Sequence, residues 1–349
     1  MNKKLVMAVL TATMVTGLGM VANAEGVIGV AMPTQDLQRW NQDGSNMKAM
    51  LEEKGYEVDL QYAGNDSATQ ASQIENMIAN GDQILVVASI DGDSLGTVLA
   101  QAKEAGIPVI AYDRLIMNTD AVSYYATFDN YLVGKTQGEY LATALDLENA
   151  DGPFNIELIT GDPGDNNVNF FFGGAMDVLQ PYFDAGKLVT PSGQMTKEEV
   201  ATANWATDAA QSRFENILSS NYADGTNLDA VLASNDSTAL GVINALAANY
   251  TGEYPIITGQ DADIANVPHI IDGTQAMSVF KDTRSLAAKV VEMVDAIMTE
   301  AEVPVNDTET YDNGTGIIPS YLCEPVAVTL DNYKEILIDS GYYTEDQLQ

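Results

Sequence analysis

A regular alternation of short apolar segments with longer helical segments constrains the fold of this chain more than any other feature. The first apolar segment, residues 26–32, is followed by a helical pattern over residues 36–54 that ends at Gly55. The later helical patterns at residues 67–80 and 94–105 also end just before a glycine. Short apolar strands between such helices are typical of βαβ units, whose strands form a parallel sheet. We therefore predict an α/β fold, with the other strands of this first series at residues 56–62, 83–88, 108–112 and 124–128.

A second series of strands and helices follows residue 128. Strands are predicted at residues 154–160, 188–193, 230–233 and 256–258, and helices at residues 130–147, 167–185, 206–219 and 237–248. No Pro-rich or Gly/Ser-rich linker separates the two series, which is unusual for independent domains. We therefore predict two doubly wound parallel-sheet lobes, between which the chain crosses several times through short hinges. Residues 319–328 are expected to contain the last crossing and a closing strand.

The first residues predict export from the cytoplasm. Lys3 and Lys4 precede a mostly apolar run over residues 5–22, and Ala22 and Ala24 provide the small residues that signal peptidase requires. We therefore expect residues 1–24 to be a cleaved signal peptide and the mature chain to be periplasmic. A membrane anchor is the alternative, but the apolar run is short and interrupted for a span of about 20 residues.

Charge and composition exclude several classes of function. The formal net charge is −35, which argues against nucleic acid as a partner because nucleic-acid binding needs a basic surface. The single cysteine, Cys323, and the single histidine, His269, exclude a disulfide within the chain, zinc sites and most catalytic triads. We predict that Cys323 is buried in a strand, and we expect no catalytic residue, metal ligand or cofactor. A secreted glycosidase that uses only carboxylates remains an alternative.

Polar and aromatic residues directly follow six of the apolar segments. They occupy residues 32–40, 111–114, 161–167, 234–236, 259–261 and 280–284. In open α/β sheets, ligands bind beyond the carboxyl ends of the strands. Because these six segments come from both halves of the chain, we expect a ligand to lie between two lobes. Their Arg, Lys, Asp, Asn and Trp side chains suit an uncharged ligand rich in hydroxyl groups, such as a sugar.

The two tryptophans are candidates for stacking on a sugar ring, whose C–H faces are apolar. Polar residues surround Trp40, which favours a place in the site, whereas Trp205 could equally be a core residue. Asp113 and Arg114 follow a strand directly, and an Arg that is held by carboxylates can bind adjacent hydroxyl groups. A salt bridge at the end of the strand is the alternative reading of this pair.

Two segments of the second lobe have alternative explanations. One of Ser234, Asn235 and Asp236 is expected to cap the helix that follows them. The glycine-containing turn over residues 161–167 precedes a helix, and phosphates often bind at the start of such a helix. Asp162 and Asp165 in this turn would repel a phosphate, so we do not predict phosphate binding there.

These segments also resemble those of a known family, the periplasmic sugar-binding receptors of ABC importers, and within it the group that binds xylose or multiple monosaccharides. The resemblance extends over nearly the whole mature chain. The matching segments are QIENMI (residues 73–78), AYDRLI (111–116), VSYYATFDN (122–130), SGQM (192–195), TGQDAD (258–263), FKDTR (280–284) and PSYL (319–322).

The resemblance implies a periplasmic binding protein fold of type I, with two lobes joined by three hinge crossings. One lobe would comprise residues 25–129 and 282–319, and the other would comprise residues 130–281 and 320–349. Carried over by motif, the sugar-binding residues would be Arg39, Trp40, Asp113, Arg114, Asn167, Trp205, Asn235, Asp261 and Lys281, with Gln35, Phe171, Arg213 and Asp236 as further candidates.

The resemblance also implies a function without chemistry. The ligand would be an aldose such as xylose, glucose, galactose or arabinose, and the partner would be an ABC permease in the inner membrane, with a chemoreceptor or sensor kinase as a further partner. A receptor of the same fold for ribose, inositol or an autoinducer is the main alternative. A sugar-responsive transcription regulator shares this core, but it needs a DNA-binding headpiece where this chain has the predicted signal peptide.

Overall fold

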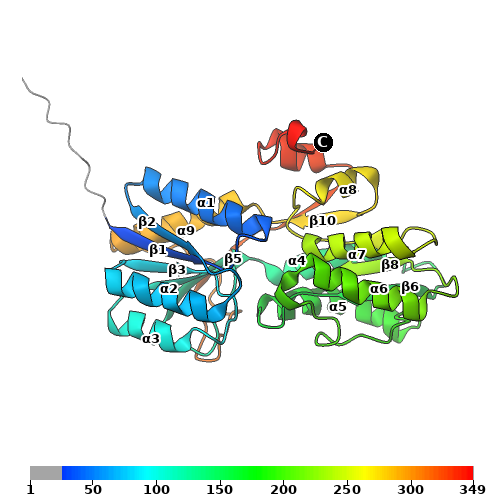
Figure 1. Ribbon diagram of the computed structural model, residues 1–349, viewed down its shortest axis with the longest axis horizontal. Coiled ribbons are helices and arrows are strands. Elements are labelled where there is room, and N and C mark those ends of the chain that lie inside the picture. Colours follow the sequence, from blue (N-terminus) through cyan, green and yellow to red (C-terminus); the bar gives the residue numbers. More distant parts are fainter. Residues whose placement is uncertain (1–25, 349) are drawn as a thin grey trace, which may run out of the picture.

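The computed structural model describes residues 26–348. The predicted signal peptide, residues 1–24, lies outside the described residues, as do Glu25 and Gln349. The described chain forms two α/β lobes side by side (Figure 1). No helix within residues 26–348 combines the length and the apolar character needed to cross a membrane.

The first lobe contains a six-stranded sheet of order β11-β5-β4-β3-β1-β2, in which all paired strands are parallel. Helices α1 and α9 cover one face of this sheet, and α2 and α3 cover the other (Figure 1). The strands are β1 (Val27–Met32), β2 (Glu57–Tyr62), β3 (Ile84–Val87), β4 (Val109–Tyr112), β5 (Val122–Phe128) and β11 (Ser320–Cys323), and the helices are α1 (Gln38–Glu53), α2 (Ser67–Asn80), α3 (Gly96–Glu104) and α9 (Thr283–Met298).

The second lobe contains a four-stranded parallel sheet of order β7-β6-β8-β9, and β10 and β12 form an antiparallel pair beside it. A bridge between Gln260 and Val279 joins this pair to the end of β9. The strands are β6 (Phe154–Ile159), β7 (Leu188–Val189), β8 (Ala230–Ala233), β9 (Ile256–Ile257), β10 (Met277–Phe280) and β12 (Val326–Thr329). The helices are α4 (Asn130–Ala144), α5 (Asn167–Asp184), α6 (Thr207–Asn221), α7 (Asp236–Asn249) and α8 (Val267–Asp272), with short helical turns η1 (Ala203–Trp205), η2 (Lys334–Asp339) and η3 (Glu345–Leu348).

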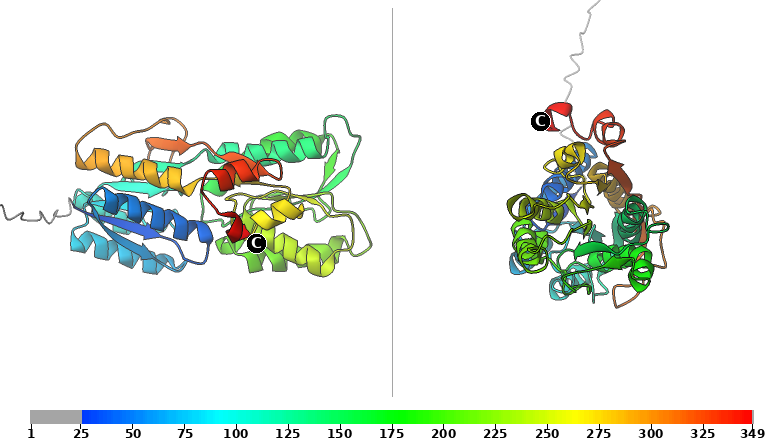
Figure 2. Two further views of the ribbon diagram at one scale, coloured as in Figure 1. Left: turned by 90° about the horizontal axis from the view of Figure 1, so that it is seen from above. Right: turned by 90° about the vertical axis from the view of Figure 1, so that its right-hand side faces the viewer.

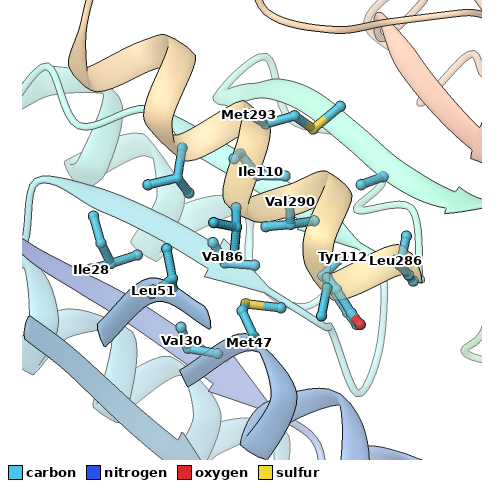
Figure 3. Close-up of a cluster of buried hydrophobic side chains, with 14 of the residues drawn as sticks. Ile28, Val30, Met47, Leu51, Val86, Ile110, Tyr112, Leu286, Val290 and Met293 are labelled. Atoms are coloured by element: carbon cyan, nitrogen blue, oxygen red, sulfur yellow. The ribbon is translucent and has the colours of Figure 1, made fainter. Parts of the chain in front are cut away.

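Burial on both faces explains the continuous apolar strands of the first sheet. All four residues of β3 and of β4 are buried, as expected for parallel strands that helices cover on each side. Figure 3 shows Leu286, Val290 and Met293 of α9 in one buried cluster with Met47 and Leu51 of α1 and with apolar residues of the strands. Helix α9 and the first part of the chain therefore share one core, although more than two hundred residues separate them in the sequence.

Glycines allow α4 and α5 of the second lobe to approach very closely. A Cβ atom built at Gly174 would lie 2.2 Å from the carbonyl oxygen of Tyr131, and one at Gly134 would lie 1.9 Å from that of Phe171. Both obstacles are backbone atoms, which cannot rotate away. The two helices therefore depend on glycine at their contact.

We expect Gly174→Ala to lower the free energy of unfolding by about 1–3 kcal/mol, because the added methyl group would force the helices apart. Its neighbour provides a matched control: a Cβ at Gly173 meets no atom within 4 Å. Gly173→Ala should instead stabilise the helix by about 0.5–1 kcal/mol. Urea denaturation of both variants measures the difference, and equal midpoints would contradict the close packing.

Within residues 26–348 the chain crosses between the lobes three times. The crossings follow β5, β10 and β11. The third crossing lies further along the chain than the expected boundary after Pro319. The reason is that β11 pairs with β5 along Ser320–Cys323 and so extends the first sheet. The change of lobe therefore comes after Cys323, and two strands, β11 and β12, occupy the region where one closing strand was expected. The prediction that Cys323 is a buried strand residue is confirmed, and burial raises the pKa of its thiol to about 11.

After β12 the chain continues as a C-terminal segment, residues 330–348, that contains η2 and η3. It lies beside α8 and above the junction of the lobes (Figures 1 and 2). Leu337 and Tyr343 of this segment pack with Val267, Ile270 and Val328 in a buried cluster of the second lobe. The segment is therefore anchored on the second lobe, and its contacts with the first lobe are described below.

Candidate functional site

A cavity lies between the lobes, at the place where ligands bind in open α/β sheets. The residues around it follow the carboxyl ends of β1, β4, β6, β8, β9 and β10 or belong to η1. They are Leu37, Arg39, Trp40, Asp113, Arg114, Asp165, Phe171, Trp205, Asn235, Ser237, Gln260, Asp261, Asp263 and Lys281. The structure thus brings the ends of strands from both lobes around one space.

Arg39 is the centre of the charged network beside this cavity. Its guanidinium group donates to Asp43 at 3.1 Å, to Asp113 at 2.9 Å and to Asp261 at 3.3 Å. The first two carboxylates belong to its own lobe, and Asp261 belongs to the other. Tyr112 donates its hydroxyl proton to the second oxygen of Asp43. Arg39 therefore links the lobes and is itself fixed on three sides.

Lys281, at the second crossing, lies between two of the same carboxylates. Its Nζ atom is 3.1 Å from Asp261 and 3.9 Å from Asp113. Burial alone would raise the pKa of Asp113, but the positive charges of Arg39, Lys281 and Arg114 lower it below the usual value. Asp113 is therefore ionised and can accept hydrogen bonds from hydroxyl groups.

Arg114 makes the second link between the lobes. Its Nε atom lies 3.0 Å from the carboxylate of Asp165, and the indole N–H of Trp205 donates to the same oxygen at 3.2 Å. The guanidinium groups of Arg39 and Arg114 lie 4.7 and 5.0 Å from the ring centre of Trp40. Cations near an aromatic face stabilise its position, so both tryptophans are held by charged neighbours. The sequence left the role of Trp205 undecided; its side chain lines the cavity.

Several residues around the cavity have backbone angles that non-glycine residues rarely adopt. The φ angles are 58° at Asp113, 56° at Trp205 and 93° at Asp261. At Asp113 the carbonyl oxygen accepts three hydrogen bonds, from Tyr125, Thr127 and Asn167, which hold this conformation. Strained backbone maintained by surrounding bonds is concentrated at functional sites.

Four of the predicted site residues do not line the cavity. Asn167 instead connects the lobes by donating to the carbonyl oxygen of Asp113 at 2.7 Å. Asp236 is buried behind the site, where Ser278 and Gln275 donate to it. The side chain of Gln35 is exposed. Arg213 lies at a separate surface hollow and donates to the carbonyl oxygen of Leu158.

Asn235 combines both roles that the sequence allowed for its segment. Its side-chain oxygen accepts from the backbone N–H of Thr238 and so caps α7. Its amide nitrogen has no hydrogen-bond partner among the described residues, and the side chain lines the cavity. The cap holds this amide at the cavity wall.

The sequence analysis missed five residues of the cavity wall and one buried carboxylate that supports it. Asp165 and Gln260 stand in segments that were singled out, but neither was assigned to the site. Asp43 lies four residues after Arg39 on the same helix, a spacing that brings two side chains together. Leu37 also lies in a segment that was singled out, residues 32–40, and Asp263 ends the matching segment over residues 258–263. Ser237 has no local pattern that distinguishes it from a surface position.

Burial raises the pKa of two carboxyl groups at the site into the neutral range. The pKa of Asp263 rises to about 7 through burial and through the negative charge of Asp261, against the effect of Arg39 and Lys281. Burial also raises the pKa of Asp43 to about 6, although Arg39 opposes the shift. A carboxyl group whose pKa is higher in the folded chain stabilises the fold below its unfolded pKa and loses this contribution as pH rises through the folded pKa.

We therefore expect the free energy of unfolding to be higher at about pH 5.5 than at about pH 8, with each unit of pKa shift contributing about 1.4 kcal/mol. Asp263→Asn should flatten the part of this decline near neutral pH. The exposed Asp36 provides the control, since Asp36→Asn should leave the profile unchanged. Urea denaturation at a series of pH values tests this, and an identical profile for Asp263→Asn would contradict it.

Comparison with known proteins identifies the architecture around this cavity. A sequence model described as a periplasmic binding protein domain matches residues 28–302. The chain belongs to the periplasmic binding protein family. This periplasmic binding protein is 48% identical over 332 residues to the multiple sugar-binding periplasmic protein SbpA of Azospirillum brasilense, covering 94% of this chain and 92% of the relative. It is also 48% identical over 329 residues to the multiple sugar-binding periplasmic receptor ChvE of Rhizobium radiobacter, covering 93% of each chain.

A solved structure agrees with this assignment. It is the structure of an ABC transporter solute binding protein from Clostridium phytofermentans with bound β-D-glucose. The two proteins are 70% identical, and their structures superpose with a TM-score of 0.92. The match covers 93% of this chain and 100% of the other. The predicted type I fold and the predicted family are confirmed. Close relatives of this periplasmic binding protein are sugar-binding receptors and not enzymes.

Proposed function

We propose that this protein is a periplasmic receptor that captures one aldose monosaccharide between its lobes and delivers it to an ABC permease in the inner membrane. The observation that carries the proposal is the cavity in which Trp40, Trp205 and Phe171 meet the charged groups of both lobes. Aromatic faces suit the C–H faces of a pyranose, and ionised hydrogen-bonding groups suit its hydroxyl rim.

The charges around the cavity favour a neutral ligand. Arg39, Arg114 and Lys281 provide three positive charges, and each of them is paired with carboxylates. The carboxylates are more numerous: Asp113, Asp165, Asp261 and Asp263 line the cavity, and Asp43 lies behind Arg39. An anionic ligand would have to displace these pairs, whereas a sugar hydroxyl can donate to a carboxylate and accept from a guanidinium group.

Binding would act through lobe closure. The links Arg39–Asp261 and Arg114–Asp165 join the two lobes directly, and a sugar that bonds to the same groups adds further contacts across the cleft. Such a ligand shifts an equilibrium between open and closed forms about the three crossings. The permease would then recognise the closed form.

Three further statements belong to this proposal. Residues 1–24 would direct the chain to the periplasm. Its relatives SbpA and ChvE are both named as periplasmic proteins. A chemoreceptor or sensor kinase would be an additional partner of the closed form. The sugar-binding residues would be those lining the cavity, with Asn167 and Asp236 acting behind them.

A ligand screen tests the proposal. Purified mature protein is titrated calorimetrically with xylose, glucose, galactose, arabinose, ribose and inositol, and its thermal midpoint is measured with each. A ligand present at 100 times its dissociation constant should stabilise the fold by about 2.7 kcal/mol. Stoichiometric binding of xylose, glucose, galactose or arabinose supports the proposal, and binding of ribose or inositol alone would assign another ligand to the same fold. Absence of binding by all four of these aldoses would overturn it, and release of product from a nitrophenyl glycoside would indicate a glycosidase.

A further inference from the structure

The C-terminal segment, residues 330–348, makes hydrogen bonds to both lobes. Its Tyr343 is buried, and the hydroxyl group accepts from Nε2 of Gln38 at 2.7 Å and donates to the carbonyl oxygen of Ala262 at 3.1 Å. Gln38 is the first residue of α1 in the first lobe, whereas Ala262 belongs to the loop after β9 in the second. One hydroxyl group therefore joins the two lobes.

The two partners of Tyr343 stand next to the residues that form the central link of the site. Gln38 precedes Arg39, and Ala262 follows Asp261, and these two charged groups bond to each other at 3.3 Å. The five residues thus form a closed ring of covalent and hydrogen bonds across the cleft. A displacement of the Tyr343 hydroxyl would move both ends of the Arg39–Asp261 pair.

The residues at both ends of this ring are held by several groups, and Tyr343 contacts both ends. Helix α1 has no side-chain cap at its N-terminus, and Arg39 in its first turn is held by ion pairs with Asp43 and Asp113. Ala262 and Asp261 have φ angles of 51° and 93°, a strained conformation that persists only when neighbouring groups hold it. The Tyr343 hydroxyl group is one of the groups that hold Ala262, and it is also the acceptor for Gln38 at the start of α1.

A second tyrosine strengthens the connection to the first lobe. Tyr342 donates to Oε1 of Gln42 at 3.0 Å, and the guanidinium group of Arg284 lies 4.8 Å from its ring centre. Gln42 and Arg284 belong to α1 and α9 of the first lobe. The C-terminal segment is therefore packed on one lobe and bonded to the other.

We propose that Tyr343 is a positioning residue for the sugar site, through which the C-terminal segment stabilises the closed arrangement of Arg39 and Asp261. This inference rests on the proposed function. The Tyr343–Ala262 bond lies within the second lobe and survives opening, whereas the bonds of Gln38 to Tyr343 and to the backbone N–H of Ile264, at 2.7 and 3.0 Å, exist only when the lobes meet.

The effect on affinity follows from this difference. Tyr343→Phe leaves the amide of Gln38 without its acceptor in the closed form, while in the open form water can replace it. Loss of a partly buried hydrogen bond of this kind corresponds to a change of up to roughly 10-fold in the dissociation constant. The loss should appear as faster sugar release, because the bond forms only after the lobes have closed.

The test uses the full mature chain and the variants Tyr343→Phe, Gln38→Ala and their combination. Tyr222→Phe is the matched control, because this buried tyrosine of the second lobe donates to Glu157 at 2.9 Å, far from the cavity. Sugar affinity is measured by calorimetry, and release by stopped-flow fluorescence. We expect Tyr343→Phe to bind up to about 10-fold more weakly, the double variant to bind no more weakly than Gln38→Ala alone, and Tyr222→Phe to lose stability but no affinity.

A spin-label pair measures closure without sugar and separates the two proposals. Glu75→Cys on α2 and Ser212→Cys on α6 place labels on exposed positions of opposite lobes. Tyr343→Phe should lower the closed fraction relative to the parent and to Tyr222→Phe. If the parent binds no aldose but closure still responds, the proposed function fails and only the role of Tyr343 in lobe closure stands. If the parent binds sugar and Tyr343→Phe changes neither affinity nor closure, or if the effects of the two substitutions multiply, the role of Tyr343 is overturned.

Discussion

Arg39→Met is expected to lower the free energy of unfolding by about 3–5 kcal/mol and to abolish sugar binding. The substitution keeps most of the volume of the side chain but removes the cation that Asp43, Asp113 and Asp261 share. All three carboxylates are buried. Lys281 remains close to Asp113 and Asp261, but Asp43 has no other ion-pair partner among the described residues. A buried charge that loses its partner retains its full desolvation penalty, and this penalty is the source of the large effect.

A surface ion pair provides the control for Arg39→Met. Lys54 pairs with Asp295 at 2.8 Å, but both side chains are more than a third exposed. Lys54→Met should therefore change the free energy of unfolding by less than about 1 kcal/mol. Urea denaturation of the unliganded variants compares the two, and calorimetry measures sugar binding. Similar stabilities of the two variants would show that the network around Arg39 does not hold the fold.

Gly161→Ala is expected to weaken sugar binding by at least about 30-fold, the change that corresponds to a 2 kcal/mol contribution from a central contact residue. A Cβ atom at this position would lie 2.0–2.2 Å from ring atoms of Trp205. The indole would have to leave its place and lose its bond to Asp165. The smallest possible side chain at residue 161 should thus remove an aromatic wall of the cavity.

Two comparisons isolate the cause of this loss. Trp205→Ala should weaken binding by a similar factor, and the double variant should bind no more weakly than Trp205→Ala alone. Gly173→Ala on α5 is the control for glycine substitution in this lobe, because a Cβ at Gly173 meets no atom within 4 Å, and it should leave sugar affinity unchanged. Full sugar affinity of Gly161→Ala would mean that the position of Trp205 does not contribute to binding.

Most strands and the early helices could be predicted from the sequence because their signals are local. The helix at residues 67–80 coincides with α2, where Asp66 caps the first turn and Gly81, with φ of 86°, ends the last one. The strand at residues 230–233 coincides with β8. A cap, a terminating glycine and a short apolar run each depend on only a few neighbouring residues.

The last quarter of the chain was less predictable because its elements depend on distant partners. Helix α9 was not predicted, although it packs on α1 and the first sheet. The family resemblance implied a boundary after Pro319, which assigned residues 320–323 to the second lobe, whereas β11 pairs with β5 almost two hundred residues earlier. Pairing over such a distance leaves no signal in the local sequence.

The same distinction applies to the cavity. Trp40, Asp113 and Asp261 could be found because they lie in the segments that follow strands, and the ends of parallel strands meet. Arg213 was carried over by motif, but its helix α6 directs it to the carbonyl oxygen of Leu158 and away from the cavity. Tyr343 had no signal at all, since it reaches Gln38 only through the folded C-terminal segment.

The third crossing also determines when each half of the protein can be completed. β11 is an edge strand of the first sheet, and α9 covers one face of that sheet, yet both are translated after nearly all of the second lobe. A nascent chain shorter than 323 residues has an unpaired edge at β5 and lacks part of a core that α1 requires. Completion of the first lobe is therefore coupled to synthesis of nearly the whole chain.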